Sequence, residues 1–207
     1  MRKFSFPHPA LLFISLLLTP LPSVKAEENL ARVYFFHALQ SKEEGDFLKA
    51  EGLLQKAIEL EPENADFHFE LGNLYVAEEN LQAGRFEFER AVMISPRHVA
   101  ARYNLGLVYR ELKLMAEARD QFRRVLELDP VNLKAELQIG YTYQLEGFVD
   151  EAREAFHRAQ AMDVTNPEPR EALEDLDRFE EEERARSRDA LEQSLQERQR
   201  SLRSGEF

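Results

Sequence analysis

Three stretches of the sequence repeat one pattern: ELEPENADFHFELGNLY (59–75), MISPRHVAARYNLGLVY (93–109) and ELDPVNLKAELQIGYTY (127–143). In each stretch a proline is followed ten residues later by a glycine and, after three more, by a tyrosine. The prolines, Pro62, Pro96 and Pro130, are evenly spaced along the chain. Self-similarity at a fixed interval predicts a stack of like structural units.

The same interval divides the chain into four segments, 31–64, 65–98, 99–132 and 133–166. Small and large residues recur at matching places in them: Gly72, Gly106 and Gly140 with Ala38; Tyr75, Tyr109 and Tyr143 with Ser41; Gly84, Ala118 and Ala152 with Ala50; and Phe88, Phe122 and Phe156 with Leu54. Two helices that cross closely need Gly or Ala where their backbones approach, and a proline ends the second helix. Each segment is therefore predicted to be a helix–turn–helix unit.

This pattern resembles the tetratricopeptide repeat (TPR), a helix–turn–helix unit whose period matches the spacing of these prolines. The resemblance implies an all-α fold, a right-handed α-solenoid of four TPR units over residues 31–166. The first unit lacks the Gly and Tyr, as terminal units often do because one side meets solvent. At the fourth position of each unit, often Trp in the family, the chain has Tyr34, His68, Arg102 and Glu136.

The first 26 residues have the three-part layout of a secretory signal peptide. A basic start at residues 2–3 precedes an apolar run over 10–18, and Val24 and Ala26 form a cleavage site before Glu27. An uncleaved membrane anchor is the alternative, but a span needs about 20 apolar residues, roughly twice the length of this run. We expect removal of residues 1–26, a short leader of the mature chain at 27–30, and no stable membrane span thereafter. The protein is then exported, to the periplasm in a Gram-negative bacterium and otherwise secreted.

The C-terminal segment follows the fourth unit in register, but Glu174 and Asp177 replace the Gly and Tyr that packing requires. We expect a capping helix over 167–183 that covers the apolar face of the last unit. Residues 184–207 are almost wholly polar and are predicted to be a charged, partly frayed helical tail.

Composition excludes several classes of function. The net charge is −12, and because the first 26 residues hold three bases and no acid, the rest carries −15. Such a body repels phosphate backbones, so no nucleic-acid binding is expected. The absence of cysteine excludes disulfides, thiolate zinc sites and a Cys nucleophile.

No constellation of catalytic residues is visible in the sequence. The histidines are scattered, no His-x-x-x-His pair or Gly-rich phosphate loop occurs, and we expect no enzyme activity, metal or cofactor. His37 stands where other units have Leu or Ile, so it is predicted to be a partly buried packing residue.

The resemblance implies that the first helices of the units line a concave groove. Its expected partner-binding residues are Phe35, Leu39, Phe69, Asn73, Tyr103, Leu107, Arg110, Lys134, Leu137 and Tyr141. Over all groove-facing positions of the four units the bases are Arg32, Lys42, Arg110 and Lys134 and the acids are Glu43, Asp66 and Glu111. This leaves about one net positive charge, which suits a partner with apolar anchors and a mildly acidic character. The best-known TPR ligand mode, a Lys and Asn clamp on a carboxylate, is disfavoured because Phe35 and Leu39 stand at those positions.

The sequence thus predicts a non-catalytic adaptor that binds a peptide or helix of another protein. The alternative is a self-associating scaffold, a homo-oligomer built through its terminal units or its C-terminal helix. A further alternative for the groove residues is that they pack against neighbouring helices or lie beneath the protein's own tail.

Overall fold

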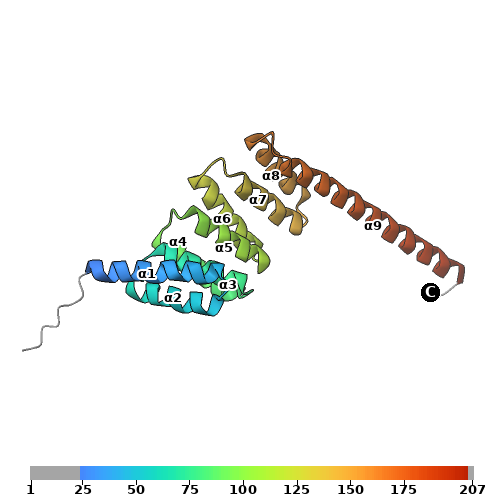
Figure 1. Cartoon of the computed structure of the whole chain (residues 1–207). Helices are drawn as coiled ribbons and strands as arrows, with labels where there is room; N and C mark the ends of the chain where they lie inside the picture. Colours follow the sequence, from blue (N-terminus) through green and yellow to red (C-terminus); the bar gives the residue numbers. More distant parts are fainter. Residues whose placement is uncertain (1–23, 205–207) are drawn as a thin grey trace, which may run out of the picture.

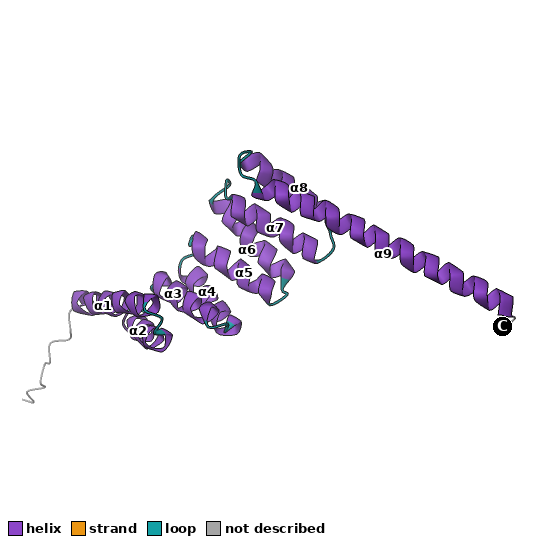
Figure 2. Ribbon diagram, turned by 45° about the vertical axis from the view of Figure 1, so that its right-hand side comes forward, coloured by secondary structure: helices purple, strands orange, loops and turns teal. Residues whose placement is uncertain are grey.

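The computed structural model of the chain describes residues 24–204, and within that range all regular structure is α-helical. Its helices are α1 (Val24–Glu43), α2 (Phe47–Leu60), α3 (Ala65–Ala77), α4 (Leu81–Ile94), α5 (Val99–Glu111), α6 (Met115–Leu128), α7 (Leu133–Leu145), α8 (Val149–Met162) and α9 (Glu168–Ser204). The first eight form four consecutive pairs stacked into an elongated array, with α9 at the far end (Figures 1 and 2). The predicted all-α solenoid of four helix pairs with a C-terminal helix is confirmed.

The helix ends recur with the same period as the sequence pattern. Asn64, His98 and Asn132, at equivalent places in successive units, each cap the next unit's first helix by accepting a hydrogen bond from a backbone N–H. The turn inside each unit passes through one residue with positive φ, namely Gly45, Glu79, Lys113 and Gly147. Only two of these four are glycine, so two turns hold an ordinary side chain in a left-handed conformation that costs about 1 kcal/mol.

The small residues of the pattern lie where the paired helices touch. A Cβ placed on Gly106 would lie 2.6 Å from Cε1 of Phe122, and one on Gly72 would lie 2.7 Å from Cε1 of Phe88. Both phenylalanines are almost fully buried. The glycine therefore provides the space into which the ring of its own unit fits.

Successive units are joined by the first helix of one unit packing on the second helix of the unit before. Ala135 and Ile139 of α7, for example, lie in one buried cluster with Phe122 and Val125 of α6. The residue at the fourth position adds a polar link: His68 Nε2 lies 3.1 Å from the carbonyl of Pro62, and Arg102 Nε donates to the carbonyl of Pro96 at 2.7 Å. His68 and Arg102 thus tie the second and third units to the turns that precede them.

The α9 helix closes the C-terminal end of the array. Its Ala172 and Leu176 are buried against Phe156 and Ala159 of α8. The helix then continues without interruption to Ser204, so the structure has no change of element at residue 183, where the sequence placed the start of a separate tail. Side chains from 186 to 200 are all exposed, and this half of α9 projects from the body (Figure 1).

Residues 1–23 of the predicted leader lie outside the described residues, and α1 begins at Val24, just before the predicted cleavage site. Among the described helices, none is long and apolar enough to cross a bilayer.

Candidate functional site

The first helices of the four units, α1, α3, α5 and α7, lie side by side and present one continuous surface. We call this surface, defined by the ten residues predicted to bind a partner, the first-helix face. Polar bonds join neighbouring helices across it. Lys42 Nζ of α1 donates to Glu70 of α3 at 2.7 Å, Asn104 of α5 donates to Asn73 of α3 at 2.7 Å, and Arg110 of α5 donates to Gln138 of α7.

The aromatic residues of this face are half-buried, because each ring rests on a phenylalanine beneath it. The ring of Phe69 lies 5.9 Å from that of Phe88, and Tyr141 lies 5.1 Å from Phe156. Phe35, in the first unit, packs instead on Phe67 of the second at 4.8 Å. The rings form a rigid floor that belongs partly to the core and partly to the surface.

The remaining predicted residues occupy three different environments. Leu39 and Leu107 are half-buried, and Lys134 is exposed. Leu137 is only 1% exposed, since it lies in one cluster with Ala172 and Leu176 of α9. The C-terminal helix α9 therefore covers Leu137, which stands in the fourth unit at the position of Phe35, Phe69 and Tyr103 in the first three. Those three aromatic residues are accessible from solvent, whereas Leu137 is not.

Sequence reasoning missed the polar residues that hold the first helices together. Glu70, Asn104 and Gln138 each directly follow a predicted floor residue and occupy the same position in their units. Each accepts or donates one of the inter-helix bonds described above. Their polar character at a constant interval was the signal that could have identified them.

The contribution of two carboxylates of α9, Glu168 and Glu171, to this face was also missed, because both residues lie outside the four repeat units. Burial, first, and then the charges of Glu168 and Glu171 raise the pKa of Tyr141. Burial likewise raises the pKa of Tyr103, with Arg110 opposing the shift and Glu168 adding to it. Carboxylates of α9 therefore add negative charge at this end of the first-helix face, where Arg110 opposes them.

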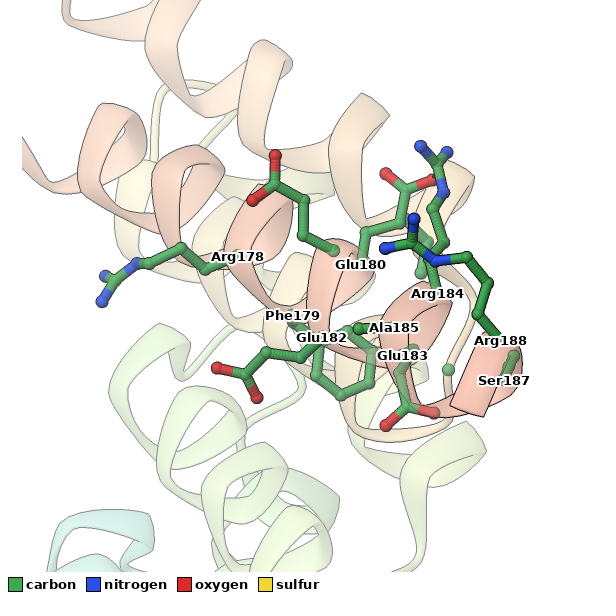
Figure 3. A pocket seen from close by; sticks show the side chains of 12 residues that line it. Arg178, Phe179, Glu180, Glu182, Glu183, Arg184, Ala185, Ser187 and Arg188 are labelled. Carbon is green, nitrogen blue, oxygen red and sulfur yellow. The ribbon is translucent and has the colours of Figure 1, made fainter. Parts of the chain in front are cut away.

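A separate hollow lies where α9 leaves the body, between α9 and the turn from α7 to α8. Gly147 and Val149 line one side, and residues 178–185, 187 and 188 of α9 line the other. Figure 3 shows the Phe179 ring beneath the helix, with charged side chains fanning outward. Glu180 and Glu183 are paired with arginines of the same helix. Across residues 27–200 no three His, Asp or Glu side chains come together as a metal site.

Two family models of the tetratricopeptide repeat match the sequence, over residues 42–87 and 87–132. Together the matched regions run from the end of α1 through α6, within the first three helix pairs. The chain is a tetratricopeptide-repeat protein. The predicted family resemblance is confirmed.

Solved structures share the TPR fold at low sequence identity. MamA from Desulfovibrio magneticus has a TM-score of 0.68 at 17% identity, over 82% of this chain and 96% of that one. YrrB, described as a TPR protein with an unusual peptide-binding site, has a TM-score of 0.62 at 24% identity, over 72% of this chain and 76% of that one. PilF from Pseudomonas aeruginosa has a TM-score of 0.64 at 22% identity, over 75% and 71%. No curated protein matches the sequence significantly.

Proposed function

We propose that this TPR protein is a non-catalytic scaffold that binds a segment of another protein on its first-helix face. Modules built from this repeat are typically interaction modules, and two structures similar in fold concern peptide binding: YrrB and the first TPR of Spaghetti bound to an HSP90 peptide. The observation that carries the proposal is the floor of half-exposed rings backed by buried phenylalanines. A rigid, partly apolar surface loses little conformational entropy when a ligand covers it.

The central two units are the best place for the ligand. Phe69, Tyr103 and Leu107 offer apolar contact there, and the bonded pair Asn73 and Asn104 offers amide groups for a peptide backbone. At the fourth unit the surface is closed by α9 over Leu137. The contact is therefore expected to be centred on α3 and α5.

The charge of the surface changes along its length, and this sets the character of the ligand. Glu168 and Glu171 lie near Tyr141 at the α9 end, so a basic side chain of the ligand would be favoured there. This differs from the mildly acidic partner expected from the four units alone. The proposed ligand is a segment with apolar anchors and a basic residue at the end that lies toward α9.

Blocking the surface without disturbing the core tests this proposal. Ala77 and Ala100 are exposed and stand at first-helix positions that face the groove in the family. A photo-crosslinker placed at Leu107 measures how much partner protein binds on this face. We expect Ala77→Trp with Ala100→Trp to abolish this crosslinking. Ala116→Trp, at an exposed alanine of the second helix α6, is the matched control and should leave capture unchanged. Equal capture by both variants would exclude the first-helix face.

Export to the periplasm or the exterior remains part of the proposal, resting on the sequence of residues 1–26. N-terminal sequencing of the protein isolated from its own cell should give Glu27 as the first residue. A protein that still begins at Met1 and stays in the cytoplasm would contradict export.

A further inference from the structure

The outer side of α1 carries a row of exposed apolar residues. Leu30, Val33 and Phe36 are 42%, 49% and 66% exposed, and their spacing of three places them along one side of the helix. His37 and Gln40 are exposed and continue the row. We call these five residues the α1 stripe; it contains no Asp, Glu, Lys or Arg, and it lies after the predicted cleavage site.

In the later units, the residues equivalent to Val33 and His37 of the α1 stripe are buried between neighbouring units. The residues equivalent to Val33 are Phe67, Ala101 and Ala135, and those equivalent to His37 are Leu71, Leu105 and Ile139; all six are at most 3% exposed. They are covered by the second helix of the preceding unit, as Phe122 and Val125 cover Ala135 and Ile139. Within residues 24–204 no helix precedes α1, so the same kind of surface is left open. The prediction that His37 is partly buried was wrong for this reason.

The opposite end of the array cannot cover the α1 stripe. There α9 buries its apolar side against α8, and its outward residues Glu174, Asp175, Asp177 and Arg178 are exposed and charged. Burying that charged surface against Leu30, Val33 and Phe36 would strip its water without supplying partners. Head-to-tail stacking of copies is therefore disfavoured, although α1 and α9 lie at the two ends of the molecule (Figure 1).

We propose that two copies of this chain pair through their α1 stripes about a two-fold axis. A two-fold contact joins the same surface of both copies, so an uncharged apolar row meets an uncharged apolar row. The two-fold axis of the proposed dimer is perpendicular to the helices, so the two α1 helices run antiparallel. This arrangement sets Val33 opposite His37 of the second copy and Leu30 opposite Gln40, with the Phe36 rings near the axis.

Helix electrostatics favour the antiparallel direction. The N-terminal end of each α1 carries a partial positive charge and its C-terminal end a partial negative charge, so antiparallel helices bring opposite dipole ends together. The contact involves essentially one helix from each copy, which is smaller than the roughly 1,600 Å² of a standard stable interface. We therefore expect a weak dimer with a dissociation constant on the order of 10 µM.

Analytical ultracentrifugation over a range of concentrations tests the dimer. The sample is the protein isolated from its own cell, in the form that the cell has processed. We expect a monomer–dimer equilibrium that Phe36→Glu weakens by about tenfold or more with an unchanged melting midpoint. Phe86→Glu is the matched control, because Phe86 is 58% exposed but lies on α4; it should leave the equilibrium unchanged. The groove variant Ala77→Trp with Ala100→Trp should also leave it unchanged, since this dimer does not depend on the proposed partner site.

Engineered cysteines test the direction of the helices, because the chain has none of its own. A mixture of Leu30→Cys and Gln40→Cys copies should form a mixed disulfide faster than either variant forms one with itself. A protein that stays monomeric at concentrations about a hundredfold above the expected dissociation constant would overturn the proposal. So would a dimer insensitive to Phe36→Glu but lost in Leu195→Glu on α9, or preferential self-linking of Leu30→Cys.

Discussion

The ring of Tyr103 packs on the ring of Phe122, with centroids 5.6 Å apart and planes inclined by 58°. Phe122 is fully buried, so Tyr103 supports the core with one side while its other side lies at the surface. The same holds for Phe69 on Phe88. Truncation of either ring therefore changes the packing of the core as well as the surface.

The double variant Phe69→Ala with Tyr103→Ala should therefore lose stability as well as binding. We expect a loss on the order of 3 kcal/mol, because two cavities open beside buried phenylalanines. Urea unfolding followed by circular dichroism measures the change, with Tyr103→Phe as the control that keeps the ring. A double variant as stable as the wild type would show that both rings are surface residues only.

Substitution of Gly106 should be far more costly than substitution of Gly52. A Cβ on Gly106 would overlap the Phe122 ring, whereas a Cβ on Gly52 would meet nothing within 4 Å. We expect Gly106→Leu to cost several kcal/mol. By contrast, Gly52→Ala should stabilise the protein by about 0.5–1 kcal/mol, because alanine favours a helix interior. Thermal melting distinguishes the two, and similar midpoints for both variants would contradict the packing described.

Stability should decline in alkaline solution as the tyrosines of the unit boundaries titrate. Burial raises the pKa of Tyr109 from 10.0 to about 12, together with the Glu89 carboxylate, which accepts a hydrogen bond from the phenol with 2.9 Å between the oxygens. Burial and Glu51 do the same for Tyr75, also to about 12. Below pH 10 both states keep the proton; above it the unfolded state loses protons first, so stability falls between pH 10 and 12.

Titration of the phenolate ultraviolet absorbance measures these values directly. Glu89→Gln should lower the pKa of Tyr109, because it removes the nearby negative charge but leaves the ring buried. Tyr109→Phe assigns the signal, and Glu59→Gln, at an exposed carboxylate of α2, should change nothing. A Tyr109 signal that does not respond to Glu89→Gln would contradict the hydrogen bond.

The two halves of α9 should respond oppositely to the same substitution. Leu176 is fully buried against α8, and Leu195 is 49% exposed on the projecting half. We expect Leu176→Asp to cost about 3 kcal/mol or more, because it buries a carboxylate and uncovers Leu137 and Phe156. Leu195→Asp should change the free energy of unfolding by no more than about 0.5 kcal/mol. Equal losses in urea unfolding would mean that the projecting half also packs on the body.

The sequence by itself determined the repeat, since Pro62, Pro96 and Pro130 act through the backbone and their effect is local. The places of Gly106 and Phe122 were likewise predictable, because a close helix crossing needs a small residue whatever lies around it. The sequence also allowed the alternative that some groove residues lie beneath the protein's own C-terminal segment. This is the case for Leu137, which α9 covers.

Only the tertiary structure decided which members of a repeated position are exposed. Leu137 and Phe69 occupy equivalent positions, yet α9 covers the first and leaves the second half-exposed. His37 and Ile139 are also equivalent, but only Ile139 has a preceding helix to cover it. A repeat prescribes the same geometry for every unit, whereas burial depends on the neighbour that stacks upon it, and the neighbours differ at the two ends.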